Sequence, residues 1–117
     1  MSSDKSFVDF ITDQMRAAGG ITVKKMFGEY GLYKDGVITA LICDDKLFIK
    51  PTKAGEEFIL KDDKITLGAP YPGAKMYFHI KDRFEDREWI STLVTLSKNE
   101  LAGIKPKGKK KSQRKKA

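Results

Sequence analysis

The run VITALIC at residues 37–43 constrains the fold of this 117-residue chain most, because every position except Thr39 is apolar. A short apolar run bounded by turn residues is typical of a central strand that is covered on both faces. Asp35-Gly36 immediately before the run is a strong hairpin signal. Asp44-Asp45 immediately after it turns the chain again. The sequence therefore predicts a strand in the middle of an antiparallel sheet.

Segments on both sides of this run extend the predicted sheet. ITVKKMF at 21–27 is rich in β-branched and aromatic residues, and KLFIK at 46–50 follows the Asp-Asp turn. Together they indicate a meander of three or four strands. KMYFHI at 75–80 alternates, with Met76, Phe78 and Ile80 on one face and Lys75, Tyr77 and His79 on the other. A short strand at 65–67 is expected within the Gly/Pro-rich connector 61–74.

Helical periodicity appears in three places. An N-terminal stripe is formed by Phe7, Phe10, Ile11, Met15 and Ala18, with Ser2, Ser3 or Asp4 as its cap. Thr52 can cap a short helix that ends at Leu60. A longer helix is expected from about 85 to 101, capped by Asp82 or Glu85, with Arg87, Lys98 and Glu100 in solvent. This order predicts an α+β domain in two layers, with an antiparallel sheet packed by helices on one side.

The net charge of +7 is unevenly distributed. Eight of the 23 basic residues lie in 105–117, which leaves 15 against all 16 acidic ones, so residues 1–104 carry −1 and the tail carries +8. The tail has almost no apolar residues and is expected to be disordered, beyond a folded domain at 1–104. It is a candidate for salt-dependent, sequence-independent contact with nucleic acid, and equally for a solubilising role or for contact with acidic protein surfaces. Its cations are Lys105, Lys107, Lys109, Lys110, Lys111, Arg114, Lys115 and Lys116.

Composition excludes several classes of protein. No apolar run approaches the roughly 20 residues of a membrane helix, and MSSDKSFVDF lacks the pattern of a secretory signal. A single cysteine provides neither an internal disulfide nor a multi-thiolate zinc site. We therefore expect a cytoplasmic protein with no membrane partner.

Catalytic chemistry has little support in the sequence. An enzyme would have to use His79 with Tyr77 or Cys43, and no nucleophile, base and orienting group are recognisable together. The Asp pairs are typical of turns rather than of metal ligands, and no glycine-rich segment has the spacing of a phosphate loop. We expect a non-enzymatic protein with no catalytic residue, cofactor or metal; a small enzyme is the weakest alternative.

Two loops are candidate recognition surfaces. GEYG supplies Gly28, Glu29, Tyr30 and Gly31, where the glycines allow tight turning and close approach of a partner. YPGAKMYFH supplies Tyr71, Lys75 and Tyr77, with Arg83 expected nearby. A structural explanation also accounts for both loops: glycine and proline make the bends, and the tyrosines cover the sheet.

Several of these segments resemble one known family. KKMFGEYGLYKDG (24–36), ALICDDKLFIK (40–50), GAPYPGAKMYF (68–78) and EDREW (85–89) are similar to the TfoX/Sxy N-terminal domain family. The resemblance covers about residues 7–103. It implies a fold similar to secretion chaperones, with the order α–β(3)–α–β(2)–α. The family offers no catalytic residue or cofactor to transfer to this chain.

The resemblance also implies a function. Family members regulate natural competence in bacteria together with the cyclic-AMP receptor protein, so we expect a regulatory interaction domain with a protein partner from transcription regulation. Two features depart from the two-domain regulators: the basic tail stands in place of their C-terminal helical domain, and Glu29 stands where many relatives carry glycine. Sheet edges could pair across a homodimer, and the sequence leaves the oligomeric state open.

Overall fold

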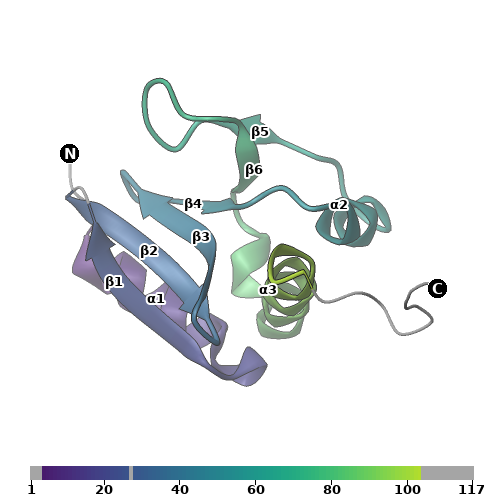
Figure 1. The fold of residues 1–117 in the computed structure, drawn as a ribbon, viewed down its shortest axis with the longest axis horizontal. Coiled ribbons are helices and arrows are strands. Elements are labelled where there is room, and N and C mark those ends of the chain that lie inside the picture. The colour runs from purple at the N-terminus through teal and green to yellow at the C-terminus, as the bar shows by residue number, and fades with distance from the viewer. Residues whose placement is uncertain (1–3, 27, 104–117) are drawn as a thin grey trace.

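The fold is built on a six-stranded antiparallel sheet, seen in Figure 1. The computed structural model describes residues 4–26 and 28–103. Along the chain the strands are β1 (Ile21–Met26), β2 (Glu29–Lys34), β3 (Val37–Cys43), β4 (Lys46–Ile49), β5 (Leu67–Gly68) and β6 (Tyr77–Ile80). Their order across the sheet is β1-β2-β3-β4-β6-β5, and every neighbouring pair is antiparallel. The expected meander is confirmed, with β3 at its centre.

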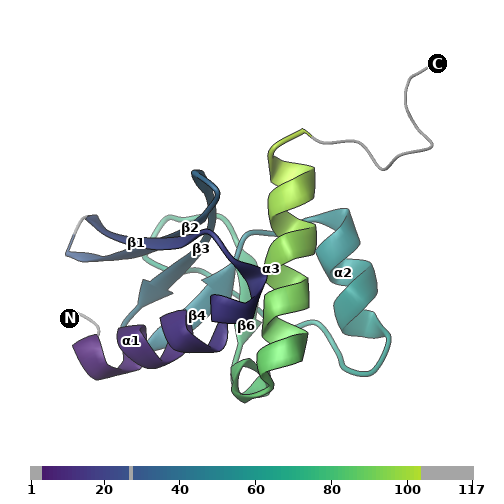
Figure 2. The same cartoon turned by 90° about the horizontal axis from the view of Figure 1, so that it is seen from below.

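Three α-helices pack on this sheet. They are α1 (Lys5–Gln14), α2 (Lys53–Leu60) and α3 (Arg87–Leu101), accompanied by two 3₁₀ turns, η1 (Arg16–Ala18) and η2 (Arg83–Glu85). Helix α3 lies between α2 and η1 and also contacts β3 (Figure 2). The α+β class is therefore confirmed. Four strands precede α2, one more than the resemblance implies, because both 21–26 and 29–34 are strands.

The main core lies between the helices and one face of the sheet. Alternate strand residues such as Leu32, Ile42 and Ile49 meet Ile11 of α1 and Leu93 of α3, and all are at most 1% exposed. Burial of such side chains is the dominant favourable contribution to folding. Among the described residues, no helix is both long and apolar enough to cross a bilayer.

Side chains fix the helix ends. The hydroxyl of Thr52 accepts a hydrogen bond from the Gly55 backbone N–H at 2.9 Å, so the predicted cap of α2 is confirmed. Glu100 of α3 adds a second anchor, since its carboxylate accepts from the N–H groups of Lys53 and Ala54 at 3.0 Å. The cap of α3 is Asp86, whose carboxylate accepts from the Trp89 N–H at 3.1 Å.

Five local expectations were wrong. Asp86 caps α3 in place of Asp82 or Glu85, because η2 occupies 83–85. The short strand is at 67–68, where β5 pairs with β6. Phe10 is 42% exposed, because the buried side of this segment is formed by Val8 and Ile11 of α1 and by Met15, which follows the helix. Met76 is 51% exposed, because β6 begins one residue later. Lys98 is largely buried near Asp35, where the hairpin turn meets α3.

Lys34 is a buried cation that joins the end of η1 to the sheet. It is 6% exposed, and its Nζ donates to the carbonyls of Ala18 and Gly19 at 2.9 Å each. It also pairs with the Asp35 carboxylate at 3.2 Å, and the hydrogen bond and charge of Lys34 lower the pKa of Asp35. Carbonyl groups at the end of a helical turn have no partner within the turn, so Lys34 satisfies acceptors that would otherwise remain unpaired.

We predict that Lys34→Met lowers the free energy of unfolding by about 2–3 kcal/mol, because the buried acceptors lose their donor. Urea unfolding followed by fluorescence of Trp89 measures this change. Lys5→Met is the matched control, since Lys5 forms an exposed pair with Asp9 and its removal should cost less than about 0.5 kcal/mol. Equal stability of the two variants would contradict a structural role for Lys34.

Candidate functional site

The second face of the sheet carries a smaller apolar cluster. Leu41, Cys43 and Phe48 are buried there, and the partly buried Met26, Ile38 and Tyr77 pack against them. All six belong to strands, whereas the core on the other face includes residues of all three helices. We call this second face, away from the helices, the open face.

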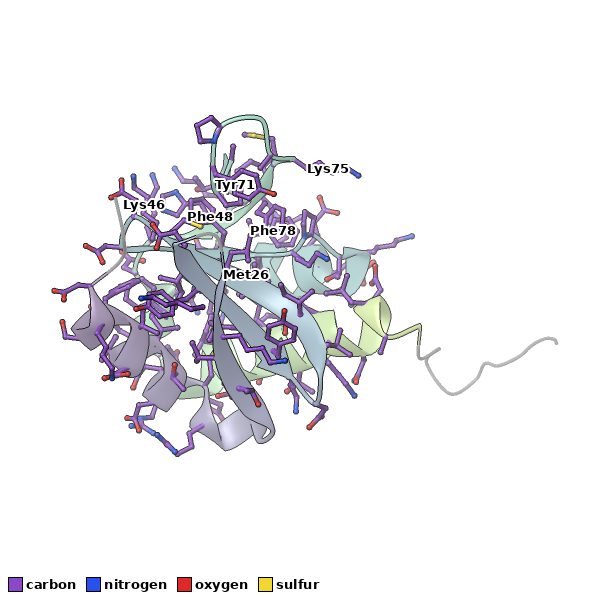
Figure 3. The ribbon with its side chains drawn as sticks, turned by 60° about the vertical axis from the view of Figure 1, so that its left-hand side comes forward. Met26, Lys46, Phe48, Tyr71, Lys75 and Phe78 are labelled. Carbon is purple, nitrogen blue, oxygen red and sulfur yellow. The ribbon has the colours of Figure 1, made fainter. Side chains whose placement is uncertain are left out.

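A groove of about 770 Å³ lies on the open face, between the β1–β2 hairpin and the segment that joins β5 to β6. Its volume is in the range of roughly 300–1,000 Å³ found for ligand sites. Figure 3 shows Tyr71 on the segment above the sheet, and Tyr71 and Met26 both line the groove. The described residues that line this open-face groove are Met26, Gly28, Glu29, Tyr30, Ile38, Leu41, Cys43, Asp44, Pro70, Tyr71, Pro72 and Tyr77.

An irregularity in the sheet supplies part of the groove floor. Leu32 pairs with Ala40 but Tyr33 pairs with Ile38, so Thr39 is an extra residue in β3. In a regular strand, Ile38 and Leu41 would face opposite sides because they are three positions apart. The bulge brings both side chains into the open-face cluster.

The two glycines of GEYG have different roles. Gly28 has φ +79° and forms the turn, a conformation that side chains rarely adopt. Gly31 leaves room for a neighbour, because a Cβ atom there would lie 2.6 Å from the Met26 sulfur and 3.4 Å from Ile38 Cδ1. The close approach that Gly31 permits is therefore that of Met26, whose side chain completes the floor.

The segment 69–76 forms the wall of the groove that faces the β1–β2 hairpin. The Ala74 N–H donates to the Tyr71 carbonyl at 3.0 Å, closing a turn with Pro72 second and Gly73, at φ +87°, third. Proline and then glycine at these positions are typical of a type II turn. Tyr71 is 55% exposed, and burial together with the neighbouring Tyr71 and Cys43 raises the pKa of Tyr77. The groove thus has two tyrosines on one side.

Two carboxylates, those of Glu29 and Asp44, lie at the end of the groove beside the β1–β2 hairpin. Glu29 accepts a hydrogen bond from the Asp44 N–H at 2.8 Å, which ties the β1–β2 hairpin to the β3–β4 turn. Asp44 has φ +53° and pairs with Lys46 at 3.7 Å, where both side chains are more than half exposed. Lys46 offsets one of the negative charges, and two carboxylates with one ammonium group give these three side chains a net negative charge.

The structure brings most of the predicted loop residues together. Gly28, Glu29, Tyr30, Tyr71 and Tyr77 all line the open-face groove. Gly31 lies beside it under Met26, whereas Lys75 points away in Figure 3. Sequence reasoning missed the floor residues Met26, Ile38 and Leu41 and the wall residues Pro70 and Pro72. The signal for the floor was the apolar character of both faces of 37–43.

Arg83 lies in a different place from the other predicted residues. Its guanidinium lies 4.4 Å from the centre of the Trp89 ring and pairs with Asp62 at 3.3 Å and Asp63 at 3.2 Å. These contacts, those with Asp62 first, raise the pKa of Arg83. The expectation that Arg83 lies near Tyr71 was therefore wrong: it joins the 61–64 segment to α3 beside a small recess of about 210 Å³.

The chemistry available in the groove is that of apolar contact rather than of nucleophilic attack. Burial, reinforced by Glu29 and Asp44, raises the pKa of Cys43 to about 11, so its thiol is protonated at neutral pH. His79 stacks on Phe48 with ring centres 5.0 Å apart, and burial lowers its pKa. Among the described residues, no group of three or more His, Cys, Asp or Glu side chains could hold a metal ion.

We predict that Cys43 of the folded protein reacts with Ellman's reagent at pH 8 about a hundredfold more slowly than the same thiol after unfolding in guanidinium. The reason is its low thiolate fraction together with its burial to 6% exposure. Absorbance at 412 nm follows the reaction. Equal rates for the folded and unfolded protein would contradict the raised pKa.

Comparison with known proteins found similar sequences over most of the chain. Residues 13–100 match the family model of the TfoX N-terminal domain. The chain is also 36% identical over 107 residues to an uncharacterized 12.7 kDa protein in the trpE 5' region of Spirochaeta aurantia, covering 92% of this chain and 90% of that protein. The matched region spans all six strands and α2, together with most of α3. The chain therefore belongs to the TfoX N-terminal domain family.

Proposed function

We propose that this protein is a regulatory interaction domain that binds another protein through the open-face groove. The observation that carries the proposal is an apolar hollow with an exposed aromatic side chain, Tyr71, at its wall. Aromatic residues are enriched in protein interfaces because they bury a large apolar area while keeping a polar end. A hollow of this kind is typical of a surface that another molecule covers.

Membership of the TfoX N-terminal domain family supports a regulatory process as the setting. The resemblance to competence regulators implies contact with a transcription regulator in the bacterial cytoplasm, and the proposal includes this class of partner. The family is not known as one of enzymes. The protonated Cys43 and the stacked His79 are consistent with recognition as the role of the open face.

We predict that Tyr71→Ala weakens capture of the partner about tenfold or more, because an aromatic anchor commonly contributes about 2 kcal/mol to binding. The measurement is quantitative mass spectrometry of proteins captured from source-cell lysate by the tagged full-length chain. Met76→Ala is the matched control, since Met76 is 51% exposed in the same segment and does not line the groove. Equal capture by both variants, or no captured protein, would contradict the proposal.

The charge division of the chain favours a second candidate function, contact of the tail with nucleic acid. The tail cations Lys105–Lys116 lie outside the described residues, and their assignment rests on sequence alone. Eight cations that displace phosphate counterions would give an affinity that falls steeply with salt.

We predict that the full chain binds fluorescent duplex DNA without sequence preference and that replacing the eight cations by glutamine abolishes this binding. Fluorescence anisotropy at 50 and 200 mM salt measures both effects, and full neutralisation of phosphates would weaken binding by about a thousandfold or more between these concentrations. Unchanged binding by the glutamine variant, or independence from salt, would contradict a role for the tail.

A further inference from the structure

The charges of the open-face groove select one kind of occupant. Of its described lining residues, the apolar and aromatic ones form floor and walls, and the charged ones are Glu29 and Asp44. Both are acidic, and no described lining residue is a cation; Lys46, which pairs with Asp44 from outside the lining, offsets only one of the two charges. An occupant complementary to this lining has an apolar part for the floor and a positive charge for the acidic end.

The two carboxylates are held at one end rather than distributed around the groove. The hydrogen bond from the Asp44 N–H to Glu29 fixes them as neighbours. Their negative field extends to the floor, since Glu29 and Asp44 add to burial in raising the pKa of Cys43. Tyr71 and Pro72 stand on the wall formed by the 69–76 segment. The two sides of the groove therefore differ. The acidic pair lies at the β1–β2 hairpin, and aromatic and proline residues lie in the wall formed by the 69–76 segment.

We propose that the open-face groove binds a segment of a partner protein in which an apolar side chain lies next to a lysine or arginine. This inference rests on the proposed function and names the chemistry of the partner. Other occupants fit less well. The chain's own 105–117 tail supplies cations but almost no apolar side chain. Nucleic acid would bring phosphates to Glu29 and Asp44, and a second copy would bring another acidic pair.

The test uses a phage-displayed library of random 12-residue peptides selected on the full-length protein. We expect the enriched peptides to share an apolar residue adjacent to Lys or Arg. A synthetic copy of the best peptide should bind about tenfold more weakly to Tyr71→Ala and equally well to Met76→Ala, as measured by calorimetry. Met76 is the matched control for loss of an exposed apolar side chain outside the groove.

A double substitution, Glu29→Gln with Asp44→Asn, isolates the effect of charge. Glutamine can still accept the hydrogen bond from the Asp44 N–H, and asparagine tolerates the positive φ of position 44. We expect this variant to bind the peptide about three- to tenfold more weakly. A peptide whose Lys or Arg is replaced by Gln should lose the same factor in affinity for the native protein. It should then bind the variant and the native protein equally well.

Three results would overturn the inference: no enriched peptide, enriched peptides without a cation, or binding that the acidic substitutions leave unchanged. Selection of acidic peptides that bind the basic tail would count as the second result, enriched peptides without a cation. The proposed function is tested separately by lysate capture with Tyr71→Ala. A partner lost from Tyr71→Ala but retained by the Glu29→Gln, Asp44→Asn variant would leave the interaction role standing and reject the basic segment.

Discussion

Burial of β3 on both faces is the constraint on which the rest of the structure depends. Ala40 and Ile42 are fully buried against the helices, while Leu41 and Cys43 are buried on the open face. A strand of this kind has to lie inside the sheet, with hydrogen-bonded neighbours on both sides. The hairpins at 35–36 and 44–45 provide those neighbours, and the six-stranded order follows from adding β6 and β5 beyond β4.

The two faces of β3 are covered in different ways, and this difference creates the candidate site. Three helices close one face into a continuous core. On the other face, cover comes from side chains of the strands and from the 69–76 segment, which leaves a hollow over Ile38 and Leu41. The bulge at Thr39 enlarges the apolar floor by bringing Ile38 to this side. Glu29 then connects the floor to the β3–β4 turn through Asp44.

Much of the fold was predictable because it is encoded locally. The Asp35-Gly36 turn, the Thr52 cap and the strand run at 37–43 each depend on residues within a few positions of one another. The predictions were wrong where a contact joins segments that are far apart in the sequence. Lys98 is an ordinary solvent-facing residue by helical spacing, yet Asp35, 63 positions earlier, lies 3.7 Å from it. The sequence predicted that Arg83 lies near Tyr71. In the structure its guanidinium stacks on Trp89, because η2 turns it toward α3.

The sequence alone determined the α+β class, the antiparallel meander, the helix near Thr52, and the uneven charge of +8 and −1, since these follow from periodicity, turn chemistry and composition. It also singled out the GEYG and 68–78 loops, although turn formation alone was the favoured explanation of both. Only the tertiary structure placed them on one groove. The two loops meet because β6 pairs with β4 across the sheet, and sequence spacing carries no information about a contact that strand order creates.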